Sequence, residues 1–282
     1  MSGRVPAAVS FASTAVTAVL IFSLAACGGP ASVPAVGSVA TEVRASLDSG
    51  KESFDSSDWG RMLAAGTHSG LVDYGWFAEH RGDLDAFLAR VAAARLGALS
   101  SPHLEALLIN AYNALTIRSI LDHPGVASIR EIDGVWNKTR HDVGGHDLTL
   151  DQIEHNLLRP FFKDPRIHFV VNCASLSCAP LASFAYDGDH LGDQLERAAL
   201  AFLSDPKQVR VEDGTLYLSS YFKWYGKDFL ADGWSPRADT LPGFIARYAT
   251  PEVAAAIKAA GDGIPVKFLD YDWKLNAAGA GA

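Results

Sequence analysis

Two cysteines follow an apolar run in "RIHFVVNCASLSCAPL", residues 166–181, and they are the only sulfur nucleophiles downstream of Cys27. Three kinds of chemistry fit the pair. An even number of cysteines in an exported domain predicts a Cys173–Cys178 disulfide, which closes a short loop and contributes roughly 2–3 kcal/mol. Alternatively Cys173 is a catalytic nucleophile, or the two thiols cycle between dithiol and disulfide.

A cysteine nucleophile needs a base and a group that orients the base. The candidate bases for Cys173 are His155 and His168, and Glu154 or Asn172 could orient the imidazole. The backbone N–H groups of the "ASLS" loop that follows Cys173 are candidate donors to an oxyanion. Cysteine-dependent hydrolysis or acyl transfer is therefore the leading enzymatic hypothesis.

Two features of the sequence count against a reactive cysteine. A low-pKa cysteine usually heads a helix, and redox pairs are usually spaced CxxC at a helix start. "RIHFVV" has the length and β-branching of a buried strand, and alternation would put His168 on the face opposite Cys173. This geometry makes His155, from the preceding helix, at least as good a base.

Glu154 lies in the apolar stripe of the predicted helix "TLDQIEHNLLRP", which Thr149 and Gln152 begin as a capping box. A buried carboxylate needs a cation or several hydrogen-bond donors. The favoured interpretation is an ion pair with Arg118, Arg159 or Arg166. The functional alternative is that Glu154 orients a histidine or acts as acid or base.

"SPHLEALLINAYNALTIRSILDHPG" predicts a long, largely buried helix, because Pro102 suits its first turn and apolar residues cover most of its circumference. Asn110 and Asn113 lie three residues apart on it. Buried amides must find hydrogen-bond partners. The favoured interpretation is that they tie down a neighbouring loop, and the alternative is that they orient a catalytic side chain or bind substrate.

"TRHDVGGHDLTL" predicts a β-hairpin that turns on Gly144 and Gly145 and places His141 and His146 on one face. Two histidines without a third ligand are weak support for a metal. We expect neither a metal nor another cofactor.

The remaining patterns predict an amphipathic helix in "HLGDQLERAALAFLSD", a second hairpin in "QVRVEDGTLYLSS", and a closing strand in "PVKFLDYDWKL". Helices cluster early and hairpins come later, which predicts an α+β fold rather than regular βαβ winding. We expect one domain with several helices packed on a small, mostly antiparallel sheet, with an architecture similar to the papain and transglutaminase-like group.

The N-terminal residues 1–26 combine Arg4, an apolar segment and small residues before Cys27, which predicts a secretory signal. "LAAC" is similar to a bacterial lipobox and implies a diacylglycerol anchor on Cys27, so the bilayer is an expected partner. Gly28 implies the periplasmic face of the outer membrane in a Gram-negative host. Residues 27–53 predict a flexible linker, residues 54–275 the domain, and residues 276–282 a disordered tail.

The formal net charge is −8, and removing residues 1–26 with Arg4 makes it −9. An acidic domain without a basic run argues against a nucleic-acid partner. Peptides or proteins of the cell envelope are the expected ligands.

The motifs "INAYNALTI", "LTLDQIEHNLLR" and "DPRIHFVVNCASLSCAPL" resemble the DUF547 family, whose function is uncharacterised. The resemblance covers roughly residues 58–273. Residue by residue, the family pattern falls on a set of polar positions shared with the candidates above: Asn110, Tyr112, Asn113, Glu154, His155, Arg159, Arg166, His168, Asn172, Cys173 and Cys178. The family name implies no particular activity. Two alternatives to an enzyme therefore stay open: a non-catalytic binding or scaffold module held by a disulfide, and a thiol–disulfide redox protein.

Overall fold

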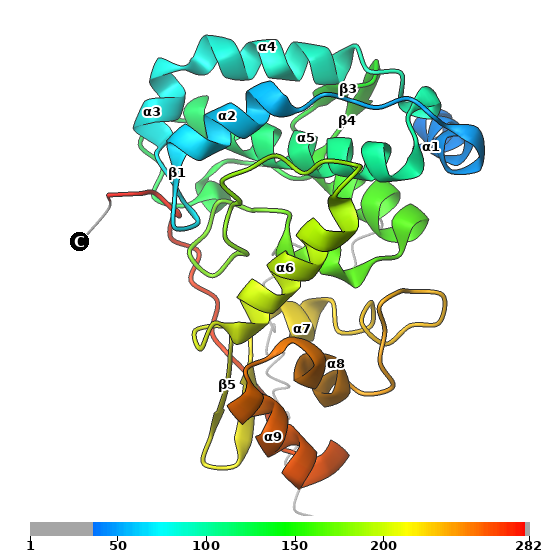
Figure 1. Ribbon diagram of the computed structural model, residues 1–282. Helices are drawn as coiled ribbons and strands as arrows, with labels where there is room; N and C mark the ends of the chain where they lie inside the picture. The colour runs from blue at the N-terminus through cyan, green and yellow to red at the C-terminus, as the bar shows by residue number, and fades with distance from the viewer. Residues whose placement is uncertain (1–35, 280–282) are drawn as a thin grey trace, which may run out of the picture.

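The computed structural model describes residues 36–279 (Figure 1). The predicted signal sequence, the predicted lipidated Cys27 and the last three residues lie outside this range. Within it, no helix combines the length and the apolar composition that crossing a bilayer requires.

Most of the described chain is helical, and the helices carry the majority of the core. The nine α-helices of residues 36–279 are α1 (Gly37–Ser49), α2 (Ser57–Gly66), α3 (Tyr74–Glu79), α4 (Arg81–Ala92), α5 (Ser101–Leu121), α6 (Leu191–Ser204), α7 (Tyr221–Trp224), α8 (Leu241–Tyr248) and α9 (Pro251–Ala260). The described chain also contains a π-helix, η3 (Gln152–Phe162), and the 3₁₀ helices η1 (Leu96–Ala98), η2 (Ile129–Glu131), η4 (Pro165–Phe169) and η5 (Gly261–Gly263).

The strands form three small sheets, so the predicted α+β class is confirmed. β1 (Thr67–His68) pairs with β2 (Leu71–Val72), and β3 (His141–Val143) pairs with β4 (His146–Leu148) in the predicted hairpin register. β5 (Val209–Glu212) and β6 (Thr215–Leu218) form the second predicted hairpin, and β7 (Val266–Phe268) adds to β6 in parallel.

The predicted central helix is α5, and its burial fits the sequence pattern. Pro102 occupies its first turn, and nearly every residue from His103 to Ile120 is buried. The predicted capping box before η3 is also confirmed, since Thr149 N–H donates to Gln152 Oε1 at 3.0 Å and Gln152 N–H donates to Thr149 Oγ1 at 3.1 Å.

Three sequence predictions are corrected by the structure. The predicted linker contains α1, because Val39, Val43 and Ser46 share one buried helical face. The predicted strand over residues 166–171 is instead the 3₁₀ turn η4, which begins where the Asp164 side chain accepts from Arg166 N–H. The predicted tail, residues 276–282, is wrong at its start, because Asn276 is 2 % exposed and hydrogen-bonded; residues 280–282 lie outside the described range.

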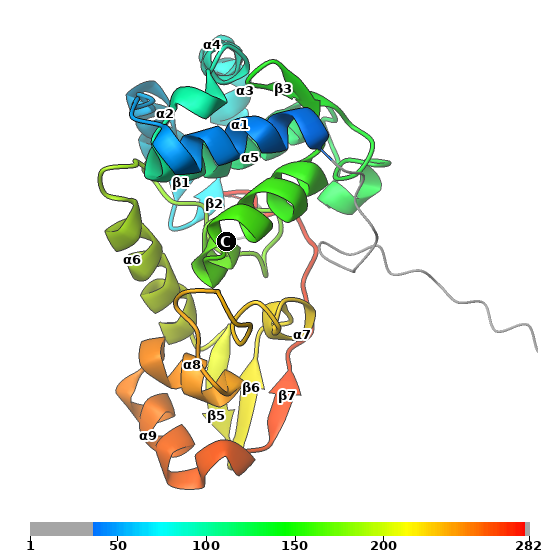
Figure 2. The same cartoon turned by 90° about the vertical axis from the view of Figure 1, so that its right-hand side faces the viewer.

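Two apolar cores meet around the cysteine-bearing segment. The helices α1–α5 and η3 surround one core, while β5, β6, α7, α8 and α9 surround the other, as the upper and lower parts of Figure 2 show. The helix α6 contributes to both, with Leu191 and Leu195 in the first core and Ala199, Phe202 and Leu203 in the second. Val170 and Val171 pack into the first core, whereas Phe169, Cys173 and Cys178 pack into the second. The segment therefore lies where the two cores join.

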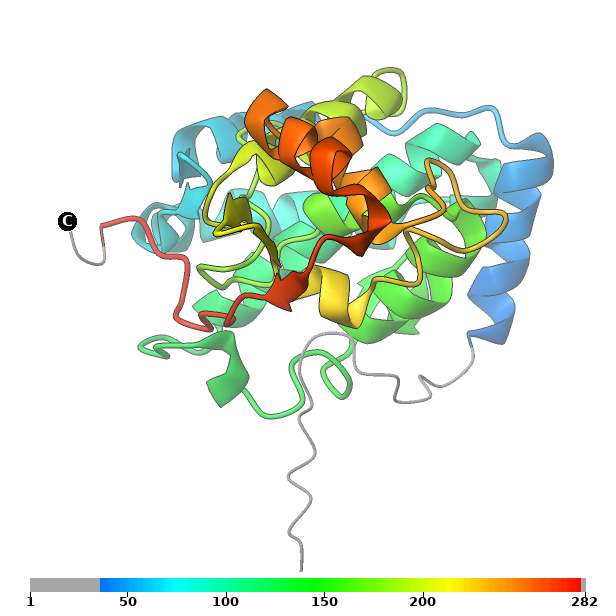
Figure 3. The ribbon, with the colours of Figure 1, turned by 90° about the horizontal axis from the view of Figure 1, so that it is seen from below.

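Residues 269–279 run from β7 back to the helical part of the molecule, as the red end of the chain shows in Figures 2 and 3. We call this segment the C-terminal strap. It is bound to the cysteine segment by hydrogen bonds from Leu176 N–H to Lys274 O at 2.9 Å and from Ser177 N–H to Asp272 O at 3.2 Å. The strap thus covers one side of the two cysteines.

Candidate active site

The loop of residues 170–181 holds both cysteines, and buried amides fix its backbone. Asn113 donates to Val170 O at 2.9 Å and accepts from Asn172 N–H at 2.8 Å. Asn172 donates to Ala179 O at 2.7 Å and accepts from Ala174 N–H at 2.9 Å. Ala174 has a φ of +57°, a conformation that L-residues rarely adopt, so these bonds hold a sharp turn directly after Cys173.

The two sulfur atoms lie 3.0 Å apart, and both cysteines are free thiols. Cys178 Sγ accepts from Cys173 N–H at 2.8 Å and from the Tyr221 hydroxyl at 3.0 Å. Burial raises the pKa of Cys178 well above its ordinary value, and the neighbouring Cys173 adds to this effect. Cys178 therefore keeps its proton at neutral pH.

His168 is buried and held by an acid that sequence reasoning missed. Its Nε2 lies 2.9 Å from Asp228 Oδ2. Arg159 donates to both oxygens of Asp228, at 2.7 Å from Nε and 2.9 Å from Nη2. The His168 ring also stacks on Tyr225 with 4.0 Å between ring centroids, so its orientation is fixed from two directions.

The charge on Asp228 determines which nitrogen of His168 carries the proton. Burial acts to raise the pKa of Asp228, but the hydrogen bonds from His168 and Arg159 outweigh it and lower the pKa to about 2. An ionised carboxylate only accepts hydrogen bonds, so Nε2 of His168 bears the hydrogen. Burial lowers the pKa of His168, and Asp228 opposes this only in part. Neutral His168 therefore carries its lone pair on Nδ1.

Nδ1 of His168 has no hydrogen-bond partner and lies 4.0 Å from Glu154 Oε1. Glu154, His168 and Cys173 line one small cavity of about 10 Å³, close to the room that one water molecule needs. Four more residues complete the lining: Tyr112, Val171, Tyr221 and Tyr225. A free imidazole nitrogen, a carboxyl group and a thiol thus meet in one enclosure.

Because residues 165–169 form a turn rather than a strand, the alternation argument against His168 does not apply. His155, the other predicted base, lies outside the residues that line the cavity. Its Nδ1 accepts from Arg159 at 3.1 Å and lies 3.7 Å from Glu154 Oε1. The structure brings Glu154, His168 and Cys173 together and places His155 beside them.

The arginines expected to pair with Glu154 bind other carboxylates. Arg159 binds Asp228, and Arg118 binds Asp85 and Asp122. Arg166 binds Asp164 at 2.6 Å and Glu196 at 3.0 Å. Among the described residues Glu154 forms no ion pair with these arginines, although its charge acts to raise the pKa of Arg159. Its Oε1 lies 3.7 Å from His155 Nδ1 and 4.0 Å from His168 Nδ1.

The other predicted residues are spread over the scaffold. Asn110 donates to Tyr186 O at 2.7 Å and accepts from Tyr186 N–H at 3.0 Å, so it ties down a loop as expected. His146 binds Glu42 at 2.8 Å, whereas Nε2 of His141 is buried without a hydrogen-bond partner. The hairpin histidines do not converge on a common ligand.

Three of the four "ASLS" backbone N–H groups predicted as oxyanion donors are already bonded. Ala174 N–H binds Asn172 Oδ1, while Leu176 and Ser177 N–H groups bind the C-terminal strap. The physical reason is the strap itself, which pairs with this loop and which the sequence alone did not place there.

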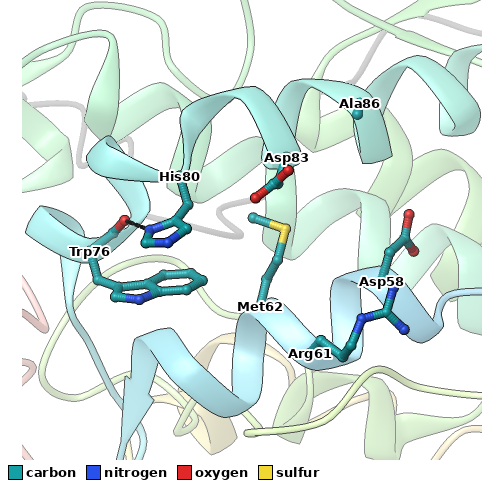
Figure 4. Close-up of a pocket in the computed structure, with 7 residues that line it drawn as sticks. All are labelled: Asp58, Arg61, Met62, Trp76, His80, Asp83 and Ala86. Carbon is teal, nitrogen blue, oxygen red and sulfur yellow. Dashed lines mark hydrogen bonds between the residues drawn. The ribbon is translucent and has the colours of Figure 1, made fainter.

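A larger cavity of about 330 Å³ lies between α2, α3 and α4 (Figure 4). Its wall includes Trp76 stacked on His80, with ring centroids 3.9 Å apart, and His80 Nδ1 bonds to Trp76 O at 2.8 Å. Asp58 and Arg61 lie across from this pair (Figure 4). None of the described residues that line this larger cavity is a cysteine. We therefore take the cavity beside Cys173 as the candidate active site, although it is the smaller of the two.

The fold and this cavity define an α+β protein with a buried thiol, imidazole and carboxylate centre. Residues 96–203 match the family model described as "Protein of unknown function, DUF547". The match includes Glu154, His168 and both cysteines, whereas Asp228 and the strap lie beyond it. No curated protein and no solved structure matches the chain.

Proposed function

We propose that the protein is a cysteine-dependent hydrolase or acyltransferase in which Cys173 is the nucleophile, His168 the general base and Asp228 the group that orients His168. One observation carries the proposal: ionised Asp228 fixes the proton of His168 on Nε2, so Nδ1 keeps a lone pair that meets no hydrogen-bond partner among the described residues, and His168 lines the same cavity as Cys173. Asp228 replaces Glu154 and Asn172 as the orienting group.

The reaction follows from this arrangement. Nδ1 of His168 takes the proton of Cys173, and the thiolate attacks the carbonyl carbon of an acyl donor. The bond to the leaving amine or alcohol breaks, the proton on Nδ1 passes to the leaving group, and a thioester forms on Cys173. Water or an acceptor amine, deprotonated by His168, then attacks the thioester and regenerates the thiol.

Glu154 supports the charged form of His168 in this cycle. Its Oε1 lies 4.0 Å from Nδ1, and its charge acts to raise the pKa of His168. The imidazolium formed after proton transfer thus lies between the carboxyl groups of Asp228 and Glu154. Glu154 is a stabilising group in this proposal, not the base.

The substrate class is proposed from the N-terminal sequence. An export signal followed by a lipidated Cys27 would hold the domain at the cell envelope, on the outer membrane of a Gram-negative host, where peptides and proteins are the available acyl donors. The acidic charge of −9 after cleavage fits such ligands better than nucleic acid.

The test is acylation of the purified protein by p-nitrophenyl acetate, with the adduct located by peptide mass spectrometry. We expect the acetyl group on Cys173, and acylation at least about 100-fold slower in His168→Gln, since general base catalysis contributes that much. The matched control is His190→Gln, because His190 is an exposed histidine that also binds an aspartate. Equal acylation of Cys173 in both variants would exclude His168 as the base.

A second candidate function is thiol–disulfide exchange, favoured by the 3.0 Å separation of the two sulfurs. Alkylation of the protein with and without prior reduction separates the possibilities. A free, fast-reacting Cys173 supports the nucleophile, ready interconversion supports redox chemistry, and a bond that resists mild reductant supports a binding or scaffold module with a structural disulfide.

A further inference from the structure

A catalytic thiolate has to be stabilised, and the usual device is missing at Cys173. Reactive cysteines commonly head a helix, whose N-terminus favours negative charge. Cys173 instead lies in a loop, and the nearest helix that follows, α6, starts at Leu191. Its own N–H is bonded to Cys178, and the N–H of Ala174 is bonded to Asn172.

Two hydroxyl groups lie against the sulfur from the side that the strap covers. The Tyr271 hydroxyl is 3.1 Å from Cys173 Sγ, and Ser175 Oγ is 3.4 Å from it. The two hydroxyl oxygens are 2.7 Å apart, so the three atoms form a closed triangle of hydrogen-bond distances.

We propose that the hydroxyl groups of Tyr271 and Ser175 are the donors that stabilise Cys173 as a thiolate, an inference that rests on the proposed role of Cys173 as nucleophile. Each of the three groups carries one hydrogen while Cys173 is a thiol, so each can donate to the next around the triangle. After His168 takes the proton of Cys173, the sulfur only accepts. Both hydroxyls can then turn their hydrogens toward it.

The strap holds the Tyr271 hydroxyl in place. The Tyr271 ring packs against Trp273 at 4.4 Å and Trp224 at 4.9 Å between ring centroids. The next residue, Asp272, accepts from Ser177 N–H at 3.2 Å, and its N–H donates to Ser177 Oγ at 2.8 Å. The phenol therefore needs little reorganisation when charge develops on the sulfur.

Each sulfur lies within hydrogen-bond distance of its own tyrosine hydroxyl. Tyr221 donates to Cys178, whose pKa burial raises well above its ordinary value. Cys178 does not line the cavity and stays a thiol, so the proton that leaves is the one on Cys173. Besides Tyr271, the titratable groups around Cys173 come from three places. Cys178 lies in the same loop, Tyr74 lies on α3, and the others line the cavity: Glu154, His168, Tyr112, Tyr221 and Tyr225.

The experiment measures the pKa of Cys173 directly, from the ultraviolet absorbance of the thiolate and from the pH dependence of its alkylation by iodoacetamide. Tyr271→Phe keeps the ring packing and removes one hydroxyl. We expect the pKa of Cys173 to rise by about one unit or more, with alkylation at neutral pH about tenfold slower, because hydrogen bonds to a charged group are the strong ones. Ser175→Ala should shift it in the same direction.

The matched control is Tyr217→Phe, since Tyr217 lies on β6 and its ring faces Arg210 and Lys267 instead. If wild-type Cys173 forms no thiolate near neutral pH, the proposed function fails. If wild-type Cys173 does so and neither Tyr271→Phe nor Ser175→Ala moves its pKa more than the control, this inference alone is overturned. Thermal melting shows whether each variant is folded. If Tyr271→Phe is not folded, the pKa of Cys173 in Ser175→Ala decides whether the inference holds.

Discussion

Replacing Asp228 with asparagine tests the electrostatics of the site independently of any substrate. Asp228 is 6 % exposed and accepts from both His168 and Arg159. Its pKa is about 2 in the folded protein against an ordinary value of 3.8. This difference corresponds to about 2.5 kcal/mol of stability when the carboxylate is ionised. Removing one partner of a buried ion pair costs about 3–5 kcal/mol, and Arg159 is partly exposed, so we expect Asp228→Asn to lose about 3 kcal/mol.

The pH dependence of this loss has a definite sign. Between the two pKa values of Asp228 the unfolded chain binds more protons than the folded protein, so stability rises with pH there. The contribution of Asp228 is complete above about pH 4 and is lost as pH falls toward about 2. The stability difference between wild type and Asp228→Asn should therefore shrink across that interval.

The assay is urea denaturation followed by circular dichroism at a series of pH values. The matched control is Asp232→Asn, because Asp232 binds Arg237 at 3.5 Å while its side chain is 99 % exposed. An exposed pair contributes at most about 1 kcal/mol, so the control should stay close to wild type at every pH. Equal losses in the two variants, or a loss in Asp228→Asn that does not change with pH, would refute the assignment of Asp228 as a buried, ionised carboxylate.

Three further predictions follow from buried groups of the same region. Treatment with hydrogen peroxide should oxidise Cys173 and join it to Cys178 with loss of water, which peptide mapping without reductant detects; recovery of two unlinked cysteines would contradict the 3.0 Å contact. Asn113→Ala should lower the free energy of unfolding by about 2–3 kcal/mol, because two buried backbone groups lose their hydrogen-bond partner. The control is Asn137→Ala at an exposed position, which should change the free energy of unfolding by less than about 0.5 kcal/mol; urea denaturation measures both. Burial raises the pKa of Glu105 to about 8, so the stability of the wild type should fall as pH rises from about 5 to about 8. Glu105→Gln should flatten this pH dependence. An equal pH dependence in the variant would show that the carboxyl group of Glu105 is not responsible.

Local signals predicted several elements from α5 onward correctly. The α5 helix, the capping box at Thr149 and the two hairpins depend on contacts within a few residues, and all four formed as expected. The strand predicted over residues 166–171 failed for a physical reason. Its apolar residues pack where two cores join, and Val170 and Val171 N–H groups both bond to Ile167 O rather than to a neighbouring strand.

The candidate site was predicted in part, and the missing part is non-local. Glu154, His168 and Cys173 lie within twenty residues of one another, so their types and spacing were enough to single them out. Asp228 lies 60 residues beyond His168, and Tyr271 lies 98 residues beyond Cys173. A signal for Asp228 was present, since a lone acid in the aromatic run "YFKWYGKDF" suggests a carboxylate buried among rings.

The cysteine loop combines a strained turn with bonds to elements from three parts of the sequence. Asn113 on α5 holds its beginning, the strap holds its middle, and the Tyr221 hydroxyl accepts from Ala179 N–H at 3.0 Å near its end. A structural loop would need only enough bonds to satisfy its backbone. Here the same contacts also put a hydroxyl within hydrogen-bond distance of each sulfur, and Cys173 shares its cavity with His168. A positive φ at Ala174 has an energetic cost, which the bonds that Asn113 and Asn172 make to the neighbouring backbone offset.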